Sequence, residues 1–382
     1  MRCKRLIWLL VTAAVLVAGC TIDPPLHLKK TVQTRVVLTT SVTTSVMWQY
    51  NWQTLWTFPW NETVWGPLKY SNPAGLRMHI YTLGPSGSPV SHTAYNFDGL
   101  SGEVPVFIGT HDLLFHNNRS EVLLFRSDGD LADQYAYTRI ISSGLKRTVP
   151  VKTLLQKAST KADDADDDFL PDEMVAYAPD ELYTLFKPGF EITDDMSQYE
   201  YIDGKYVLRI KGNMAPASFI YLIQVNLANN FDRVIGCQGG AAITGVAPEV
   251  NMRTNITGSE AVTIPTDVRY DGDTNPDQLG IRIISFGIPG CNPYDAESVA
   301  NAPDGKHFLV LSITYFDHTY KNIRVDITDQ FRSLPTGGVI TLDLDVNDFP
   351  PETSDGPITN GGGFNPLVNP WQEETGGTSI LS

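Results

Sequence analysis

The chain has 382 residues, with 43 acidic and 28 basic side chains and a formal net charge of −15 at pH 7. This acidity excludes nucleic acid and anionic lipid surfaces as expected partners, because both carry negative charge. The length exceeds one ordinary hydrophobic core and predicts two domains.

The first 20 residues have the pattern of a bacterial lipoprotein signal. Three basic residues precede an apolar run over residues 6–18, which is too short to span a bilayer and leads into VAGC, ending at Cys20. We expect residues 1–19 to be removed as a signal peptide and Cys20 to carry acyl chains, palmitate among them, that anchor the protein stably in a membrane. The predicted location is the outer membrane, lipid-anchored and exposed at the cell surface. An ordinary signal peptide with a chance cysteine is the alternative.

Five of the seven tryptophans gather in the stretch MWQYNWQTLWTFPWNETVW. A spacing of four holds Trp48, Trp52, Trp56 and Trp60 near one face of a helix, or on one face of a strand, but Pro59 argues against a continuous helix. We expect Trp48 to be core. For the next three tryptophans, core packing, a patch for a partner or a glycan, and contact with a membrane all remain open.

Strand patterns occupy most of the remaining chain. GLRMHIY places Leu76, Met78 and Ile80 on one face and alternates them with Arg, His and Tyr, and VITLDLDV does the same from Ile340. FIYLIQVNL, IRIISFG and HFLVLSITYF add apolar runs that are bounded by Gly, Pro, Asn and Asp. Only VKTLLQKAST and PDELYTLF are candidates for short helices. The pattern predicts an all-β protein built from sandwiches.

The acidic run in KADDADDDFLPDE, over residues 163–168, predicts an exposed loop because its charges repel one another. A calcium site is the alternative, but the glycine and the terminal glutamate of an EF-hand loop are absent. DGDTNPD has Pro276 where that loop needs glycine. No metal site is therefore predicted at either segment.

Two cysteines remain after the signal segment, Cys237 and Cys291. In an oxidising compartment a disulfide between them is one alternative, and free buried thiols are the other.

Motifs for catalysis are absent from the sequence. There is no G-x-S-x-G elbow, H-E-x-x-H, Walker loop or G-x-G-x-x-G. His111, Asp112 and His116 are candidate metal ligands, but a strand would place His111 and His116 on opposite faces, so we expect surface or hydrogen-bonded histidines. The sequence predicts neither an enzyme nor a cofactor.

A resemblance is carried by segments spread over nearly the whole mature chain. They include a Val-rich strand ending at Trp48, then GLRMHIY, HDLLFHNNRSEVLLF, APDELYTLF, VLRIKGNMAPASFIYLIQVNL, ITGVAP, ISFG, VDITDQF and GGGFNPLVNPWQEE. In these the chain resembles the fimbrillin superfamily of surface lipoproteins, and within it the anchor and minor-subunit branch of type V fimbriae. The segment Asp326–Gln330 and the GGGFNP tail are the more specific marks. The stretch rich in tryptophan is longer than expected after the first strand.

The resemblance implies two tandem transthyretin-like, Greek-key β-sandwich domains, export as a lipoprotein and assembly of subunits by strand exchange. Polymerising members are trimmed after an arginine, and Arg35 is the only candidate early enough in this chain. We expect the N-terminal sandwich, with the acidic loop, over residues 20–197 and the C-terminal sandwich over residues 198–382. The tail offers Ile380 and Leu381 as apolar plugs for strand addition, with a disordered terminus as the alternative.

The function expected from these observations is a fimbrial anchor or accessory subunit with a structural and adhesive role. Its partners would be other fimbrial subunits, and the lipid on Cys20 would join it to the membrane. The alternative is a glycan-binding surface lipoprotein of a nutrient-uptake system, in which Trp52, Trp56 and Trp60 stack on sugar rings.

Overall fold

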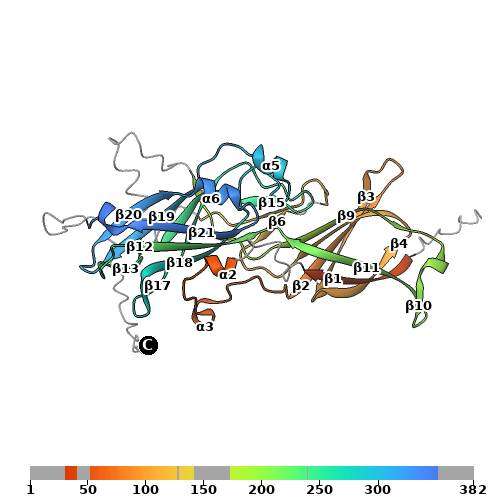
Figure 1. Cartoon of the computed structure of the whole chain (residues 1–382). Helices are drawn as coiled ribbons and strands as arrows, with labels where there is room; N and C mark the ends of the chain where they lie inside the picture. The colour runs from red at the N-terminus through yellow and green to blue at the C-terminus, as the bar shows by residue number, and fades with distance from the viewer. Residues whose placement is uncertain (1–30, 41–51, 127–128, 142–172, 239, 352–382) are drawn as a thin grey trace, which may run out of the picture.

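The computed structural model describes residues 31–40, 52–126, 129–141, 173–238 and 240–351. Figure 1 shows an elongated molecule in which two groups of strands follow one another along the long axis. Nearly every regular element is a strand, so the predicted all-β class is confirmed. The helices are short: α2 (Trp52–Leu55), α3 (Glu62–Trp65), η4 (Met196–Gln198), α5 (Ala296–Ala300), α6 (Thr328–Ser333) and η5 (Val346–Asp348).

The first sandwich contains β1 (Thr31–Thr40), β2 (Gly75–Leu83), β3 (Pro89–Asp98), β4 (Ser101–Phe107), β5 (Gly109–Asn117), β9 (Tyr183–Ile192), β10 (Glu200–Ile202) and β11 (Lys205–Pro216). Their order is β3-β2-β5-β9-β11-β1-β4, and β10 pairs with β11. Only the last two residues of β11 pair with β9, so the path folds there into two layers. Leu76 and Met78 of β2, Val104 of β4 and Ile210 of β11 share one buried cluster between the layers.

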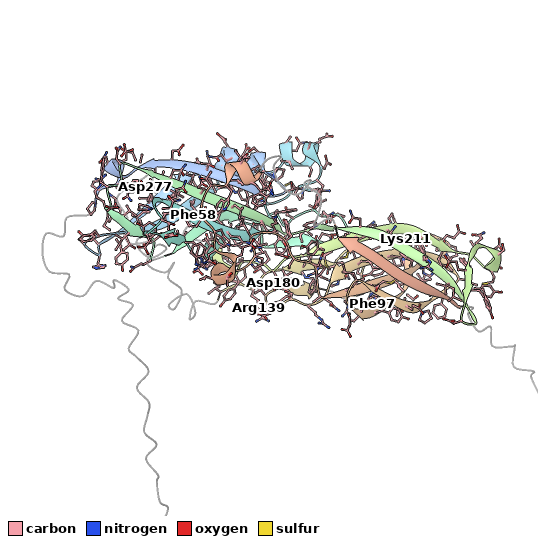
Figure 2. All side chains as sticks on the ribbon, turned by 60° about the horizontal axis from the view of Figure 1, so that its bottom comes forward. Phe58, Phe97, Arg139, Asp180, Lys211 and Asp277 are labelled. Carbon is pink, nitrogen blue, oxygen red and sulfur yellow. The ribbon has the colours of Figure 1, made fainter. Side chains whose placement is uncertain are left out.

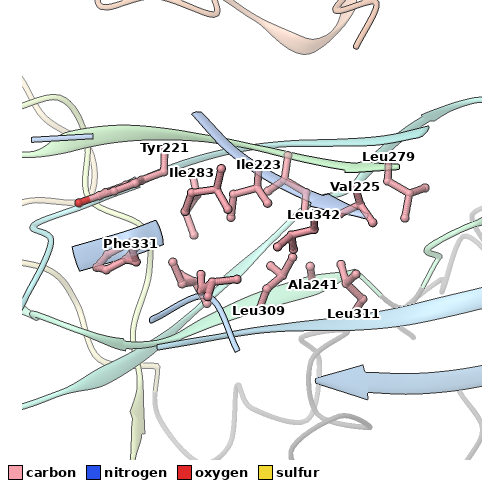
Figure 3. Packing of buried hydrophobic residues seen from close by; sticks show 14 of the residues in the cluster. Tyr221, Ile223, Val225, Ala241, Leu279, Ile283, Leu309, Leu311, Phe331 and Leu342 are labelled. Carbon is pink, nitrogen blue, oxygen red and sulfur yellow. The ribbon is translucent and has the colours of Figure 1, made fainter. Parts of the chain in front are cut away.

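The second sandwich packs a sheet of order β17-β18-β12-β21 against one of order β13-β19-β14-β16-β8, in which β20 also pairs with β19. Ile223 and Val225 of β12 point across the core toward Leu309 and Leu311 of β19, as Figure 3 shows. The bounds are β8 (Met174–Val175), β12 (Phe219–Ala228), β13 (Val234–Gly236), β14 (Ala241–Val246), β16 (Val262–Thr266), β17 (Arg269–Asp271), β18 (Asn275–Ser285), β19 (Phe308–Tyr315), β20 (Tyr320–Asp326) and β21 (Gly338–Asp345).

A small sheet of order β15-β7-β6 lies where the sandwiches meet; its strands are β6 (Leu124–Arg126), β7 (Tyr135–Tyr137) and β15 (Glu249–Asn251). It covers the outer face of the first sandwich, where Tyr81 and Leu114 join Ala136 and Val250 in a third buried cluster. The period-two pattern of β2 is confirmed, since Leu76, Met78 and Ile80 share the first core. The opposite face of β2 is buried as well, because the small sheet covers it.

The boundary between the domains lies later than residues 197 and 198, where we expected it. β11 pairs with β1 and with β9, so the chain remains in the first sandwich through Pro216 and enters the second at Phe219. The chain also passes between the two sandwiches more than once. β8, which precedes β9 and β11 in the sequence, already pairs with β16 of the second sandwich.

The helix considered for PDELYTLF is wrong. Tyr183 begins β9, which pairs with β5 along most of its length. Pairing with a neighbouring strand overrides the weak local helix propensity of this segment. The other candidate helix, VKTLLQKAST, lies outside the described residues.

Candidate functional site

β1 lies between two other strands of the first sandwich. It runs parallel to β11 from Gln33 to Thr40 and antiparallel to β4 from Thr31 to Val37. In the described sheet, β4 ends the path and has β1 as its strand neighbour. β1 therefore fills a gap one strand wide between β4 and β11, which we call the β1 slot.

One face of the β1 slot is apolar. Val104 and Val106 of β4 and Ile210 of β11 lie on that face in one core cluster, with exposed fractions of 4% or less. An extended segment entering the slot would find backbone groups to pair with on both sides and buried side chains beneath it.

Arg35, the candidate maturation site, lies in the middle of β1. It is opposite Arg209 of β11 and Glu103 of β4. Because backbone pairing flanks it on both sides, a protease can cut after Arg35 only if β1 leaves the sheet.

Residues 52–70, which we call the tryptophan segment, cross the outer face of the second sandwich. Trp56 and Phe58 are buried and share a cluster with Ile220 and Leu222 of β12. Figure 2 shows Phe58 at the second sandwich, although it comes from the N-terminal part of the chain. The outward face of β12 is therefore covered by a segment more than 150 residues away in sequence.

Polar contacts fix the tryptophan segment in place. The backbone N–H groups of Thr57 and Phe58 donate to Gln224 Oε1 at 2.8 and 3.1 Å. Farther along, Tyr70 Oη donates to the carbonyl of Ser218 and accepts from Ile220 N–H at 3.0 Å. Burial raises the pKa of Tyr70, which keeps this hydroxyl protonated as a donor.

An ion pair closes the end of the same segment. Arg282 Nη2 of β18 lies 3.0 Å from Glu181 Oε1, and Arg282 Nε donates to the carbonyl of Leu68. Glu181 Oε2 also accepts from the backbone and the hydroxyl of Ser71. The pair is largely buried, so the carboxylate needs these donors to offset its lost hydration.

The structure places Trp52, Trp56 and Trp60 against the first core cluster. Trp56 is 7% exposed, and Trp52 and Trp60 are half-buried against the same cluster. Trp60 packs on Trp65 at 5.3 Å between ring centroids and donates its indole N–H to the carbonyl of Gly66. This arrangement corresponds to the core alternative, because the rings pack on one another rather than forming an open platform.

The segment Asp326–Gln330 spans the end of β20 and the start of α6. Asp326 Oδ1 accepts from Thr328 N–H, and Thr328 Oγ1 accepts from the backbone of His307 at 3.0 Å. Gln330 Nε2 donates to the carbonyl of Thr341, and Gln330 Oε1 accepts from Thr341 N–H at 3.1 Å. The amide of Gln330 thus occupies the free edge of β21 at one residue.

The histidines considered as metal ligands are separate and hydrogen-bonded. His111 Nε2 lies 2.8 Å from the carbonyl of Phe107, and His116 Nδ1 lies 2.8 Å from the carbonyl of Asn117. His116 also meets His79 on the outer face of β2, which the sequence did not reveal. Among the described residues, no group of three His, Cys, Asp or Glu side chains could hold a metal ion.

Cys237 and Cys291 are both buried and free, so the possible disulfide is absent and the free-thiol alternative is present. Cys237 Sγ contacts the carbonyl of Gly240, whereas Cys291 Sγ contacts that of Ile288. Burial raises the pKa of Cys237 to about 12, which suits an unreactive core thiol.

Several expected features lie outside the described residues: the signal peptide 1–19, Cys20, the acidic run at 163–168 and the tail with Ile380 and Leu381. Within the described part of the chain, no helix has the length and apolar character needed to cross a membrane.

Residues 62–267 match the family described as a domain of unknown function, DUF5119. No curated protein matches the chain. Several solved structures are similar to it at low identity. An adhesin candidate from Bacteroides ovatus has a TM-score of 0.46 and 13% identity, with 83% of this chain and 93% of that one covered.

The fimbrial anchor protein Mfa2 from Porphyromonas gingivalis has a TM-score of 0.41 and 10% identity, with 83% and 91% covered. A fimbrial assembly protein from Parabacteroides distasonis has a TM-score of 0.32 and 10% identity, with 79% and 88% covered. These similarities are distant, and the names describe those proteins.

Proposed function

The chain belongs to the family described as a domain of unknown function, DUF5119, and we propose that it is a fimbrial anchor or accessory subunit with a structural and adhesive role. It assembles with other fimbrial subunits by strand exchange through the β1 slot. The lipid on Cys20 tethers it to the outer membrane, with the two sandwiches exposed at the cell surface.

The observation that carries this proposal is the position of β1. A strand near the N-terminus pairs with β4 on one side and with β11 on the other. If β1 leaves, two unpaired strand edges remain about 10 Å apart, twice the usual spacing of neighbouring strands. Such an opening accepts one strand of another subunit, because main-chain pairing supplies the affinity and the apolar face accepts alternate side chains.

The packing of the tryptophan segment weighs against the rival glycan-binding lipoprotein in the form that the sequence suggested. Stacking on sugar requires an open aromatic face, whereas Trp56 is buried and Trp60 packs against Trp65. A function that depends on Trp52, Trp56 and Trp60 as a platform would first have to unpack them from the core cluster.

Exchange of β1 can be tested on the full chain. A specific protease site is introduced between Thr40 and Trp52, the folded protein is cut there, and a fluorescent peptide with the sequence TVQTRVVLTT is added in excess. We expect the peptide to replace the cleaved strand and to co-migrate with the protein in size-exclusion chromatography. The control is the same peptide with Val36→Pro, which removes a backbone donor and cannot continue the ladder.

Equal uptake of both peptides, or uptake of neither while the cleaved strand remains bound, would contradict exchange through the β1 slot. Uptake of the native peptide alone supports it.

A further inference from the structure

The outward face of the second sandwich changes from apolar to polar side chains along β12. Its first outward side chains, Ile220 and Leu222, lie beneath the tryptophan segment, but the next two are Gln224 and Asn226. Beyond the tryptophan segment the same face is open and forms a hollow of about 730 Å³. Its polar lining includes Gln224, Asn226, Asn275, Asp277, Gln278 and Asp343. We call it the amide hollow.

The amide hollow lies toward the end of the molecule that is remote from the first sandwich. Figure 2 shows Asp277 at that end, farther from the labelled Lys211 of the first sandwich than Phe58 is. The position leaves the amide hollow clear of the β1 slot.

The side-chain amides of the hollow are already oriented by one another. Gln224 Nε2 and Gln278 Nε2 both donate to Asn226 Oδ1, at 3.1 and 2.8 Å. Asn226 Nδ2 in turn donates to Asp343 Oδ1 at 2.7 Å, and Gln278 Nε2 also reaches Thr57 Oγ1. A ligand would therefore meet polar groups whose directions are set before it binds, which lowers the ordering cost of binding.

The groups left over in the amide hollow include donors and acceptors. Gln224 Nε2 and Asn226 Nδ2 each use one of their two N–H groups in the hydrogen bonds above. Among the described residues, the second carboxylate oxygen of Asp343 and both oxygens of Asp277 accept no hydrogen bond. No lysine or arginine lines the hollow. An anionic ligand is disfavoured by the two carboxylates, and a ligand rich in hydroxyl donors is favoured.

A strained loop directly follows Ala228, which lines the amide hollow, and exposes an aromatic ring. Phe231 follows β12 with φ of 47°, in the left-handed region that a bulky side chain seldom adopts, and it is 81% exposed. The loop is held in place by Asn229, which donates to Asp345 Oδ2, and by Asn230, which donates to the carbonyl of Pro276. Strain that the surroundings hold in place is typical of ligand-binding positions.

From these features we propose that the amide hollow binds a neutral carbohydrate. Asp343 and Asp277 accept hydrogen bonds from its hydroxyl groups, and Phe231 offers a ring to its apolar C–H face. The inference gives the adhesive part of the proposed function its ligand and so rests on it. It does not depend on strand exchange, because the β1 slot lies in the other sandwich.

The test uses the full chain on an array of neutral and anionic oligosaccharides that contain glucose, galactose, mannose, N-acetylglucosamine or sialic acid. The neutral oligosaccharide that gives the strongest binding on the array is then titrated into the protein by calorimetry. We expect neutral oligosaccharides to bind. The double variant Asp277→Asn and Asp343→Asn keeps the shape of the hollow but removes two carboxylates, and we expect it to lower affinity at least tenfold.

Phe231→Gly supplies the second variant. Glycine adopts a positive φ without strain, so this change should hold or raise the melting temperature while it weakens carbohydrate binding. The matched control is Tyr201→Ala, which removes a 67% exposed ring from the first sandwich and should leave affinity unchanged.

The proposal is overturned if no neutral oligosaccharide binds, if binding is confined to anionic oligosaccharides, or if the carboxylate double variant and Phe231→Gly bind as the unaltered chain does. Selective binding of a lysine-rich peptide to the carboxylates would also overturn it. Any of these results leaves uptake of the β1 peptide as an independent measure of the proposed assembly role.

Discussion

His79 Nε2 lies 3.1 Å from His116 Nε2, and both rings are buried. The carbonyl of Asn117 can only accept, so the hydrogen on His116 is at Nδ1 and His116 Nε2 accepts from His79. His79 Nδ1 must then accept from His92 Nε2, which lies 2.9 Å away. All three rings form this chain as neutral imidazoles, each in one defined tautomer.

The histidine chain predicts acid sensitivity. Burial, followed by repulsion from neighbouring cationic groups, lowers the pKa of His79 to about 2, and burial lowers the pKa of His116 to about 4, from an ordinary 6.5. Below pH 6.5 these two histidines therefore bind protons in the unfolded chain, whereas in the folded chain they stay neutral until their lower pKa values are reached. Stability is full above that pH and falls as pH decreases toward 4, by about 1.4 kcal/mol per pH unit for each such histidine.

Urea unfolding at pH 7.5, 6.0 and 5.0 checks this slope. The charged group on β2 beside the chain is Arg77, and Asp130 faces Tyr81 from the covering segment. His116→Gln should flatten the slope by one proton, whereas His318→Ala, at an exposed turn, should leave it unchanged. A slope that is the same in both variants would contradict the role of the chain.

Gly280 makes room for the tryptophan segment. A Cβ atom at this position would lie 2.3 Å from Cδ1 of Phe58. We expect Gly280→Ala to destabilise the protein by about 1–3 kcal/mol, because Phe58 must shift out of a packed site. Thermal and urea unfolding measure the loss. In a chain that also carries Phe58→Ala, we expect Gly280→Ala to lower the free energy of unfolding by less. Strictly additive effects would show that the two positions do not meet.

Gln330 protects one residue on the edge of β21. Gln330→Ala leaves both backbone groups of Thr341 to water, and we expect a loss of about 1 kcal/mol, because two hydrogen bonds at an exposed site are removed. Gln198→Ala in η4 is the matched control, since its amide bonds only to a neighbouring aspartate. Equal unfolding free energies for the two variants would argue against the edge contact.

Cys20→Ser tests the lipid anchor directly. A chain with a net charge of −15 has little affinity of its own for a lipid surface, so losing the acyl chains should move the protein from the detergent phase to the aqueous phase. Phase partition of whole cells with an antibody against the chain is the measurement, and Cys237→Ser is the control. A Cys20→Ser protein that stays in the detergent phase is not held by that lipid.

The strands could be predicted because alternation is local. Leu76, Met78 and Ile80 enter one core as their spacing requires. Which strands are also covered on the face turned away from their own sandwich core could not be predicted. Phe58 and its neighbours cover that face of β12, and the small sheet at the junction covers that face of β2. The boundary at residues 197 and 198 was wrong for the same reason: β11 belongs to the first sandwich through its pairing with β1, far earlier in the chain.

The amide hollow was missed because its residues come from three strands. Only the change from apolar to amide side chains at the alternate positions 220, 222, 224 and 226 of FIYLIQVNL pointed to it. For the tryptophans, the sequence left core packing, a binding patch and membrane contact as alternatives. In the structure Trp56 and Trp65 pack against Phe58, and Trp60 packs against Trp65, which corresponds to the core alternative.

The measurement that most directly tests assembly through the β1 slot is a cross-link placed at its wall. Glu103 of β4 lies opposite Arg35 of β1 and is exposed, so a photoreactive amino acid can replace it. After irradiation of intact cells, peptides joined to position 103 are identified by mass spectrometry. Exchange predicts adducts with a strand of another subunit in surface assemblies. Adducts confined to residues 31–40 of the same chain would contradict it.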